Sequence, residues 1–123
     1  MKANTVTLKI LQAHALAIWD ILSEIHPRLA KIDPPKIALN ARLWRTAGRC
    51  YQETGQIELA AKFFPQYEKN MVNVILPHEI IHYADFVLFG DSDKKCGHGK
   101  NWQMLMLQYG LKPNPYHNMD ISR

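Results

Sequence analysis

The most informative stretch of the chain is LPHEIIH, residues 76–82, which lies within a mostly apolar segment. It contains the spacing HExxH, in which His78 and His82 are four residues apart. On an α-helix such residues lie one above the other, so both imidazoles can bind one metal ion at about 2.0–2.1 Å. Glu79 then projects beside the ion and can reach a metal-bound water without being a ligand. The spacing therefore predicts a helical zinc site with Glu79 as the general base.

A catalytic zinc ion needs a third protein ligand and an open fourth position. Two common patterns for that ligand are excluded. A metzincin would have glycine at 85 and histidine at 88, where this chain has Asp85 and Leu88. A thermolysin-like site uses a downstream glutamate, but Glu79 is the last glutamate in the sequence. The third ligand must therefore come from another type of residue.

The third ligand is sought among the histidines, cysteine and aspartates that follow the motif. These residues are His98, His117, Cys96, Asp85, Asp91, Asp93 and Asp120. His98 is the best placed, because Gly97 and Gly99 flank it and allow the backbone to approach the metal closely. Cys96 is the main alternative ligand, although a free buried thiol is its more ordinary role. The simpler alternative for His98 is a helix-capping or exposed loop histidine.

Helices are predicted on both sides of the motif. The motif lies in an apolar segment from about Lys69 to Phe89, in which Pro77 predicts either a helix start or a kink. Gly90 ends this helix, and a last helix is expected from about Lys100 to Tyr109. An N-terminal helix is expected from about Thr5 to Ile25, because apolar residues recur there every three or four positions. This apolar stripe consists of Leu8, Leu11, Ala15, Ile18, Leu22 and Ile25.

Three short strands are predicted between the first helix and the motif. They run from Lys36 to Asn40, from Ala47 to Gln52, and from Gln56 to Ala60, and Glu53-Thr54-Gly55 indicates a hairpin turn between the last two. The order of helix, three strands, helix and helix predicts an α+β domain, and we expect its three-stranded sheet to be mainly antiparallel. All residues, 1–123, are expected to form a single domain.

These motifs resemble the SprT family. The resemblance is carried by PHExxH at residues 77–82, followed after a loop by HGxxW at residues 98–102. Ala47-Gly48-Arg49 and Ile57-Glu58-Leu59 resemble the strand pair of that family, and the N-terminal helix also matches. The resemblance covers nearly the whole chain, and its helix-loop-helix motif is the specific part.

The resemblance implies a zincin-like minimal metallopeptidase domain. In such a domain His78, His82 and His98 bind zinc, and Glu79 is catalytic. The substrate would be a protein or peptide, and the family includes the Spartan proteases, which degrade proteins crosslinked to DNA. We therefore expect a zinc metalloendopeptidase that acts on DNA-associated proteins.

Family members often carry a C-terminal zinc ribbon with paired cysteines. This chain has only Cys50 and Cys96 and no CxxC pair, so we expect the domain to lack the ribbon. The alternative function is a non-catalytic zinc-binding module that binds nucleic acid or a protein partner. A structural zinc site closes with four protein ligands, and Cys96 or His117 could supply the fourth. The glutamate at 79 argues against this alternative, because a structural site needs no general base.

The charge of the chain permits a polyanionic partner. The formal net charge is +4 and the pI about 9.1. Arginines cluster at 42, 45 and 49, and lysines at 94, 95 and 100. These residues offer only a few phosphate contacts, so we expect weak, non-specific DNA binding; solvated loop charge is the alternative. The N-terminal apolar stretch is too interrupted to span a membrane, and the cysteine usage fits a reducing compartment. The expected location is therefore the cytoplasm, with no membrane partner.

Other residues have weaker functional interpretations. Tyr116 and His117 could donate hydrogen bonds to the oxyanion of a tetrahedral intermediate, although packing of the chain end is the simpler role. Trp102 could shape the pocket or belong to the core. Trp44 could stack on a base or pack at a sheet edge. Asp85 could orient a ligand imidazole or occupy an exposed helix position.

Overall fold

The computed structural model describes residues 2–43, 45–90 and 98–113, with side chains from residue 8 onward. Within these residues the helices and strands follow one another in the predicted order, which confirms an α+β fold. The elements are α1 (Lys2–Ile25), η1 (Pro27–Lys31), β1 (Lys36–Asn40), β2 (Gly48–Tyr51), β3 (Gln56–Ala60), η2 (Ala61–Phe63), α2 (Phe64–Asn70), η3 (Met71–Ile75), α3 (Leu76–Phe89) and α4 (Lys100–Tyr109). β1, β3 and α4 have the predicted bounds, whereas α1 begins three residues earlier and β2 is shorter at both ends.

The sheet is mixed, so the prediction of a mainly antiparallel sheet is wrong. Its strand order is β1-β3-β2. β2 and β3 form the expected antiparallel hairpin, whereas β1 pairs with β3 in parallel, with Lys36 opposite Gln56. The sequence indicates a turn only between β2 and β3 and identifies no partner for β1. Ile57 and Leu59 are fully buried, so β3 takes the central position and β1 pairs with its other edge.

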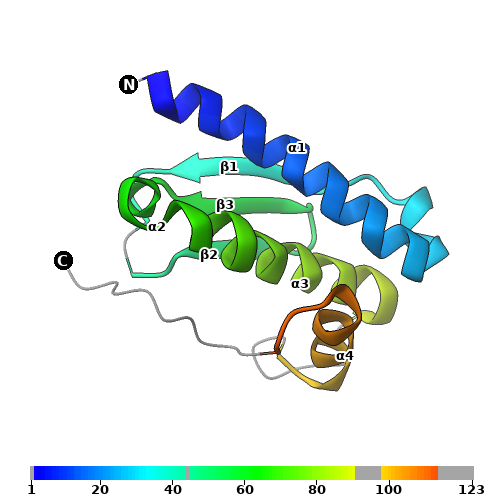
Figure 1. Ribbon diagram of the computed structural model, residues 1–123. Helices are drawn as coiled ribbons and strands as arrows, with labels where there is room; N and C mark the ends of the chain where they lie inside the picture. The colour runs from blue at the N-terminus through cyan, green and yellow to red at the C-terminus, as the bar shows by residue number, and fades with distance from the viewer. Residues whose placement is uncertain (1, 44, 91–97, 114–123) are drawn as a thin grey trace.

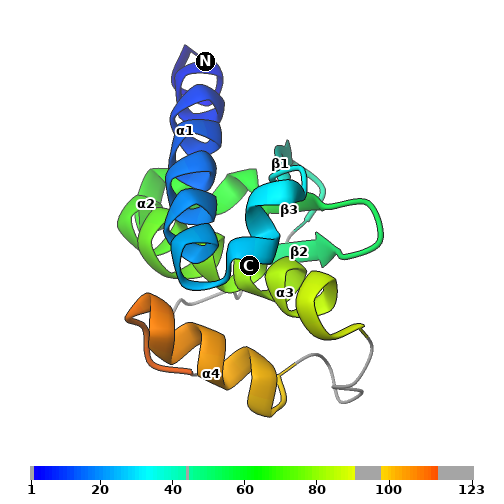
Figure 2. The ribbon, with the colours of Figure 1, turned by 90° about the vertical axis from the view of Figure 1, so that its right-hand side faces the viewer.

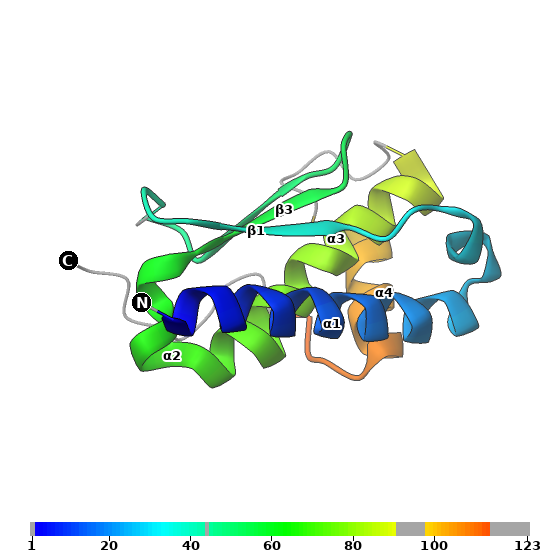
Figure 3. The same cartoon turned by 90° about the horizontal axis from the view of Figure 1, so that it is seen from above.

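The helices lie on one face of the sheet, and the described residues place no helix on the other face (Figure 1). Figure 2 shows α1 and α2 on the same side of the strands, with α4 below α3. Seen from above, α1 runs alongside α3 beneath the sheet (Figure 3). The predicted stripe of α1 supplies much of the core, since Leu11, Ala15 and Leu22 are fully buried. No described helix is both long and apolar enough to cross a bilayer.

The predicted helix around the motif consists of three segments. The chain is helical from Phe64, passes through the π-helical turn η3, and continues as α3 from Leu76. Pro77 lies in the first turn of α3, directly after the π-helical turn η3. The α-helix of the motif therefore starts in the turn of the proline, but a helical path already precedes it. Gly90 ends α3 with φ of 68°, in the left-handed range that favours glycine.

Candidate metal centre

Helix α3 carries the two histidines of the motif on one face. His78 and His82 lie one turn apart, and their ring centroids are 4.9 Å apart. Both side chains are half-buried. Because α3 begins two residues before His78, the first turn of the helix fixes the position of the histidine pair.

His98 joins this pair from the start of α4. It directly precedes Gly99, the N-cap residue of that helix. Its carbonyl oxygen accepts a hydrogen bond of 3.1 Å from the side chain of Gln103, and the Gly99 carbonyl accepts one of 3.0 Å from the Gln103 backbone N–H. These bonds fix the backbone at the helix entrance. The helix-capping or exposed alternative for His98 is wrong, because its half-buried ring points at the α3 histidines.

The Nε2 atoms of the three histidines form a small triangle. The distances are 3.2 Å from His78 to His98, 3.2 Å from His78 to His82, and 3.0 Å from His82 to His98. A ring nitrogen either donates a proton or accepts one through its lone pair, but cannot do both. Among three nitrogens in mutual contact, two must be of the same kind, so hydrogen bonds cannot satisfy all three contacts.

One cation can satisfy the three nitrogens together. Tetrahedral ligands at 2.0–2.1 Å from zinc lie about 3.3 Å apart, close to the spacing of the triangle. Among the described residues, His78, His82 and His98 form the group that can hold a metal ion. Asp85 does not belong to this group. The donor set of neutral imidazoles suits zinc and related transition metals.

Glu79 lies on the same turn of α3 and is nearly buried. Its side chain is 9% exposed, and the loss of hydration raises its pKa to about 8. A divalent cation on the neighbouring imidazoles would favour the ionised form and lower this pKa. The burial therefore supplies a carboxylate that is more basic than an exposed one.

Gly48 brings strand β2 against Glu79, a contact that the sequence analysis missed. A Cβ atom at position 48 would lie 3.1 Å from Glu79 Cγ and 3.0 Å from Ile75 Cγ2. Such distances are too short for an unperturbed side chain, so the strand approaches the helix this closely because residue 48 is glycine. The Ala47-Gly48-Arg49 segment carried the only sequence signal for this contact.

The family of the chain follows from its sequence match as well as from these motifs. The model of the SprT-like family matches residues 21–120, well over half of the chain. The chain belongs to the SprT-like family. It is 30% identical to Protein SprT of Glaesserella parasuis, over 72% of the chain and 55% of that protein. For Protein SprT of Vibrio parahaemolyticus the identity is 27%, over 72% of the chain and 52% of that protein.

A further SprT relative covers more of the chain. Protein SprT of Escherichia fergusonii is 26% identical over 86% of the chain and 62% of that protein. This SprT-like chain therefore spans between 52% and 62% of the length of these three relatives. No solved structure matches the chain.

The remaining predicted site residues of the SprT-like chain have different outcomes. Asp85 is 5% exposed, so its assignment to an exposed helix position is wrong, whereas its role in orienting an imidazole stays a prediction. Trp102 is fully buried and also contacts the three histidines, so it belongs both to the core and to the site. The other candidates lie outside the described residues: Cys96, Asp91, Asp93, Asp120, Tyr116, His117 and Trp44.

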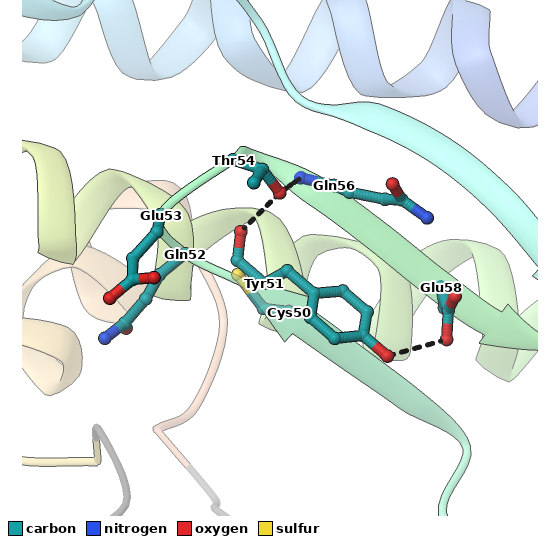
Figure 4. Close-up of a pocket in the computed structure, with 7 residues that line it drawn as sticks. All are labelled: Cys50, Tyr51, Gln52, Glu53, Thr54, Gln56 and Glu58. Atoms are coloured by element: carbon teal, nitrogen blue, oxygen red, sulfur yellow. Dashed lines mark hydrogen bonds between the residues drawn. The ribbon is translucent and has the colours of Figure 1, made fainter.

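The open face of the sheet is hollowed at the β2–β3 hairpin. The cavity volume is about 510 Å³, and Figure 4 shows its lining. The Tyr51 phenol donates a 3.2 Å hydrogen bond to Glu58, and Thr54 Oγ1 donates a 3.3 Å bond to the Tyr51 carbonyl. Cys50 also lines the hollow, and burial, followed by the charge of Glu79, raises its thiol pKa to about 12. The hollow is therefore lined in part by β2, the strand whose Gly48 lies against the Glu79 side chain.

The predicted basic clusters are only partly described. Arg42 and Arg45 are exposed, and Arg49 is exposed on β2, where its guanidinium donates a 3.3 Å hydrogen bond to the Tyr51 hydroxyl. Lys100 is exposed at the start of α4. Lys94 and Lys95 lie outside the described residues.

Proposed function

We propose that this SprT-like domain is a zinc-dependent peptidase in which His78, His82 and His98 hold the metal and Glu79 is the general base. The observation that carries the proposal is the triangle of Nε2 atoms, 3.0–3.2 Å apart, between α3 and the start of α4, together with the buried Glu79 that directly follows His78. A purely structural site would require no such carboxyl group.

The chemistry follows from the positions of these side chains. A zinc ion held by His78, His82 and His98 would lower the pKa of a bound water to about 7. Glu79 would then act as general base on the attacking water and as general acid on the amine nitrogen of the breaking C–N bond. The burial of Glu79 suits both roles, because a more basic carboxylate accepts a proton readily and its protonated form can deliver that proton to the leaving amine.

Strand β2 provides a way to align an extended substrate. In the strand order β1-β3-β2 it is an edge strand among the described residues, so its outer edge can pair with an added strand; the Gly48 carbonyl there also accepts a 3.0 Å hydrogen bond from Thr46 Oγ1. Gly48 places this strand directly against Glu79. A peptide added to the edge of β2 would therefore pass the general base with its backbone extended.

The same proposal extends to the substrate. The resemblance to DNA-associated proteases and the exposed arginines at 42, 45 and 49 support proteins bound to DNA as the substrate class. Three arginines can neutralise only a few phosphates, so the domain would bind DNA weakly and without sequence preference. Recruitment to DNA would then require a partner or a second copy.

Substitution of Glu79 tests the proposed activity. Glu79→Gln keeps the side-chain shape but cannot accept a proton, so cleavage of an unfolded protein substrate should fall at least about a hundredfold while zinc stays bound. Glu24→Gln is the matched control, because Glu24 is exposed on α1. Equal cleavage by the parent and Glu79→Gln would contradict the proposal. A parent that binds zinc but cleaves no substrate, with or without DNA, would favour the non-catalytic zinc module.

A further inference from the structure

Trp102 contacts all three candidate ligands at once. Its ring centroid lies 4.9 Å from that of His78, 5.3 Å from that of His82 and 4.7 Å from that of His98. The indole is stacked on His82, with an interplanar angle of 17°, and meets the other two rings at 61° and 72°. One side chain in the first turn of α4 thus links the histidine pair of α3 to the histidine that precedes α4.

The surroundings of Trp102 differ from those of an ordinary core tryptophan. Trp19 is also buried, but its indole N–H donates to the carbonyls of Leu29 and Ile32, at 3.1 and 3.2 Å. Trp102 is 0% exposed, and its N–H has no hydrogen-bond partner among the described residues. Within the described part of the chain, Trp102 therefore lacks the hydrogen bonds that hold Trp19, and its contacts with the three histidines are made by its ring.

We propose that Trp102 is a positioning residue that holds the three imidazoles in the orientation that binds the metal. Without a cation, three nitrogens at 3.0–3.2 Å repel in at least one contact, so the rings would tend to turn apart. The indole packs against each ring and restricts this rotation. This inference rests on the proposed metal site.

The indole also favours the metal-loaded state over the empty one. A bound divalent cation withdraws electron density from the imidazoles and makes their edges more positive. An aromatic ring packed against such partly positive imidazoles attracts them more strongly than an aliphatic side chain would. Residues that orient metal-binding histidines commonly change metal affinity by 10–100-fold when they are removed. Trp102 should therefore strengthen metal binding without being a ligand.

Zinc affinity tests this role, measured by competition with a chromophoric chelator. We expect Trp102→Leu to weaken zinc binding by at least about tenfold. Trp102→Phe retains an aromatic ring and should weaken it by about threefold to tenfold. Trp19→Phe is the matched control: it removes a buried indole elsewhere in the core and should lower the melting temperature but leave zinc affinity within about twofold.

The absorption spectrum of the cobalt(II)-loaded protein provides a second readout, because it reports ligand geometry. The visible bands should shift in both Trp102 variants and stay unchanged in Trp19→Phe. Unchanged affinity and spectrum in Trp102→Phe would overturn the inference, even if Trp102→Leu fails to fold. Equal loss of affinity in Trp19→Phe would overturn it as well. A parent that binds no zinc would instead contradict the proposed function.

Discussion

Two effects shift the pKa of the Glu79 carboxyl group in opposite directions. Its burial raises the carboxyl pKa to about 8, so in the metal-free protein the group is largely protonated near neutral pH. A cation on the neighbouring imidazoles would favour the carboxylate. Metal binding at this site should therefore release a proton from Glu79, in addition to any released by the histidines.

The metal-free protein should lose stability as the pH rises through this range. The folded state keeps the Glu79 proton up to about pH 8, whereas the unfolded chain loses it near pH 4.5. The folded state then binds more protons, so the free energy of unfolding falls as the pH rises from about 4.5 to 8. The melting temperature of the chelator-treated parent minus that of chelator-treated Glu79→Gln should decrease between about pH 6 and pH 8.5. A temperature difference that stays constant or grows over this range would contradict the prediction.

Cys50 should be an unreactive thiol. Its pKa of about 12 leaves only a few thiolates per hundred thousand molecules, roughly, near pH 7.5. In a Cys96→Ser variant, where Cys50 is the remaining cysteine, iodoacetamide should react at least about a hundredfold more slowly with the folded protein than with the urea-unfolded chain. Mass spectrometry of timed samples measures both rates. Similar rates would show that burial does not protect the sulfur.

The contact between β2 and α3 depends on the absence of a side chain at residue 48. The close approach gives the edge strand a fixed position beside the Glu79 side chain. Because protein cores are closely packed, an added methyl group must shift the strand or the side chains of Ile75, Glu79 and Leu59 by a few tenths of an ångström. The two elements together therefore define the geometry in which the carboxyl group acts.

Gly48→Ala should reduce peptidase activity more than metal binding. The added Cβ would meet Glu79 Cγ and Ile75 Cγ2, so we expect at least about tenfold lower activity and about 1–3 kcal/mol lower stability. Gly110→Ala is the control, since Gly110 has φ of 110° but no atom within 4 Å of the added Cβ. It should lower stability through backbone strain and leave the activity of the remaining folded protein intact. Activity of Gly48→Ala equal to the control would contradict a positioning effect.

At the scale of the whole molecule, the helices cover one face of a mixed sheet, and the histidines lie where α3 and α4 meet (Figure 1). Local sequence patterns predicted most of the elements, because helix periodicity and the Pro77 and Gly90 signals act within a few residues. The same holds for His78 and His82, whose convergence follows from a single helical turn.

Features that depend on distant segments were not predictable in the same way. The parallel pairing of β1 with β3 depends on which strand takes the central position in the sheet, not on the order of the strands in the sequence. The approach of Gly48 to Glu79 joins residues 31 positions apart, and the Ala47-Gly48-Arg49 segment does not indicate which residue of the helix it contacts. The flanking glycines favour His98 among several donors, and the family resemblance then implies the same ligand.

The isolated chain should bind DNA weakly. The net charge of +4 and a few exposed arginines predict a dissociation constant on the order of 10⁻⁴ to 10⁻⁶ M at physiological salt, without sequence preference. Fluorescence anisotropy over several salt concentrations measures this dissociation constant. Arg42→Glu combined with Arg45→Glu should make the plot of log affinity against log salt concentration less steep, by the amount expected for the loss of about two phosphate contacts. Nanomolar binding that persists at physiological salt would reveal a dedicated DNA-binding surface.

The central claim is a catalytic zinc site with three histidine ligands and one open position, and X-ray absorption at the zinc edge of the loaded protein tests it most directly. We predict one zinc ion per chain with a single shell of nitrogen and oxygen ligands at about 2.0–2.1 Å, including three imidazoles and a water. A sulfur ligand at about 2.3 Å, a fourth protein ligand in place of water, or the absence of bound zinc would contradict the account.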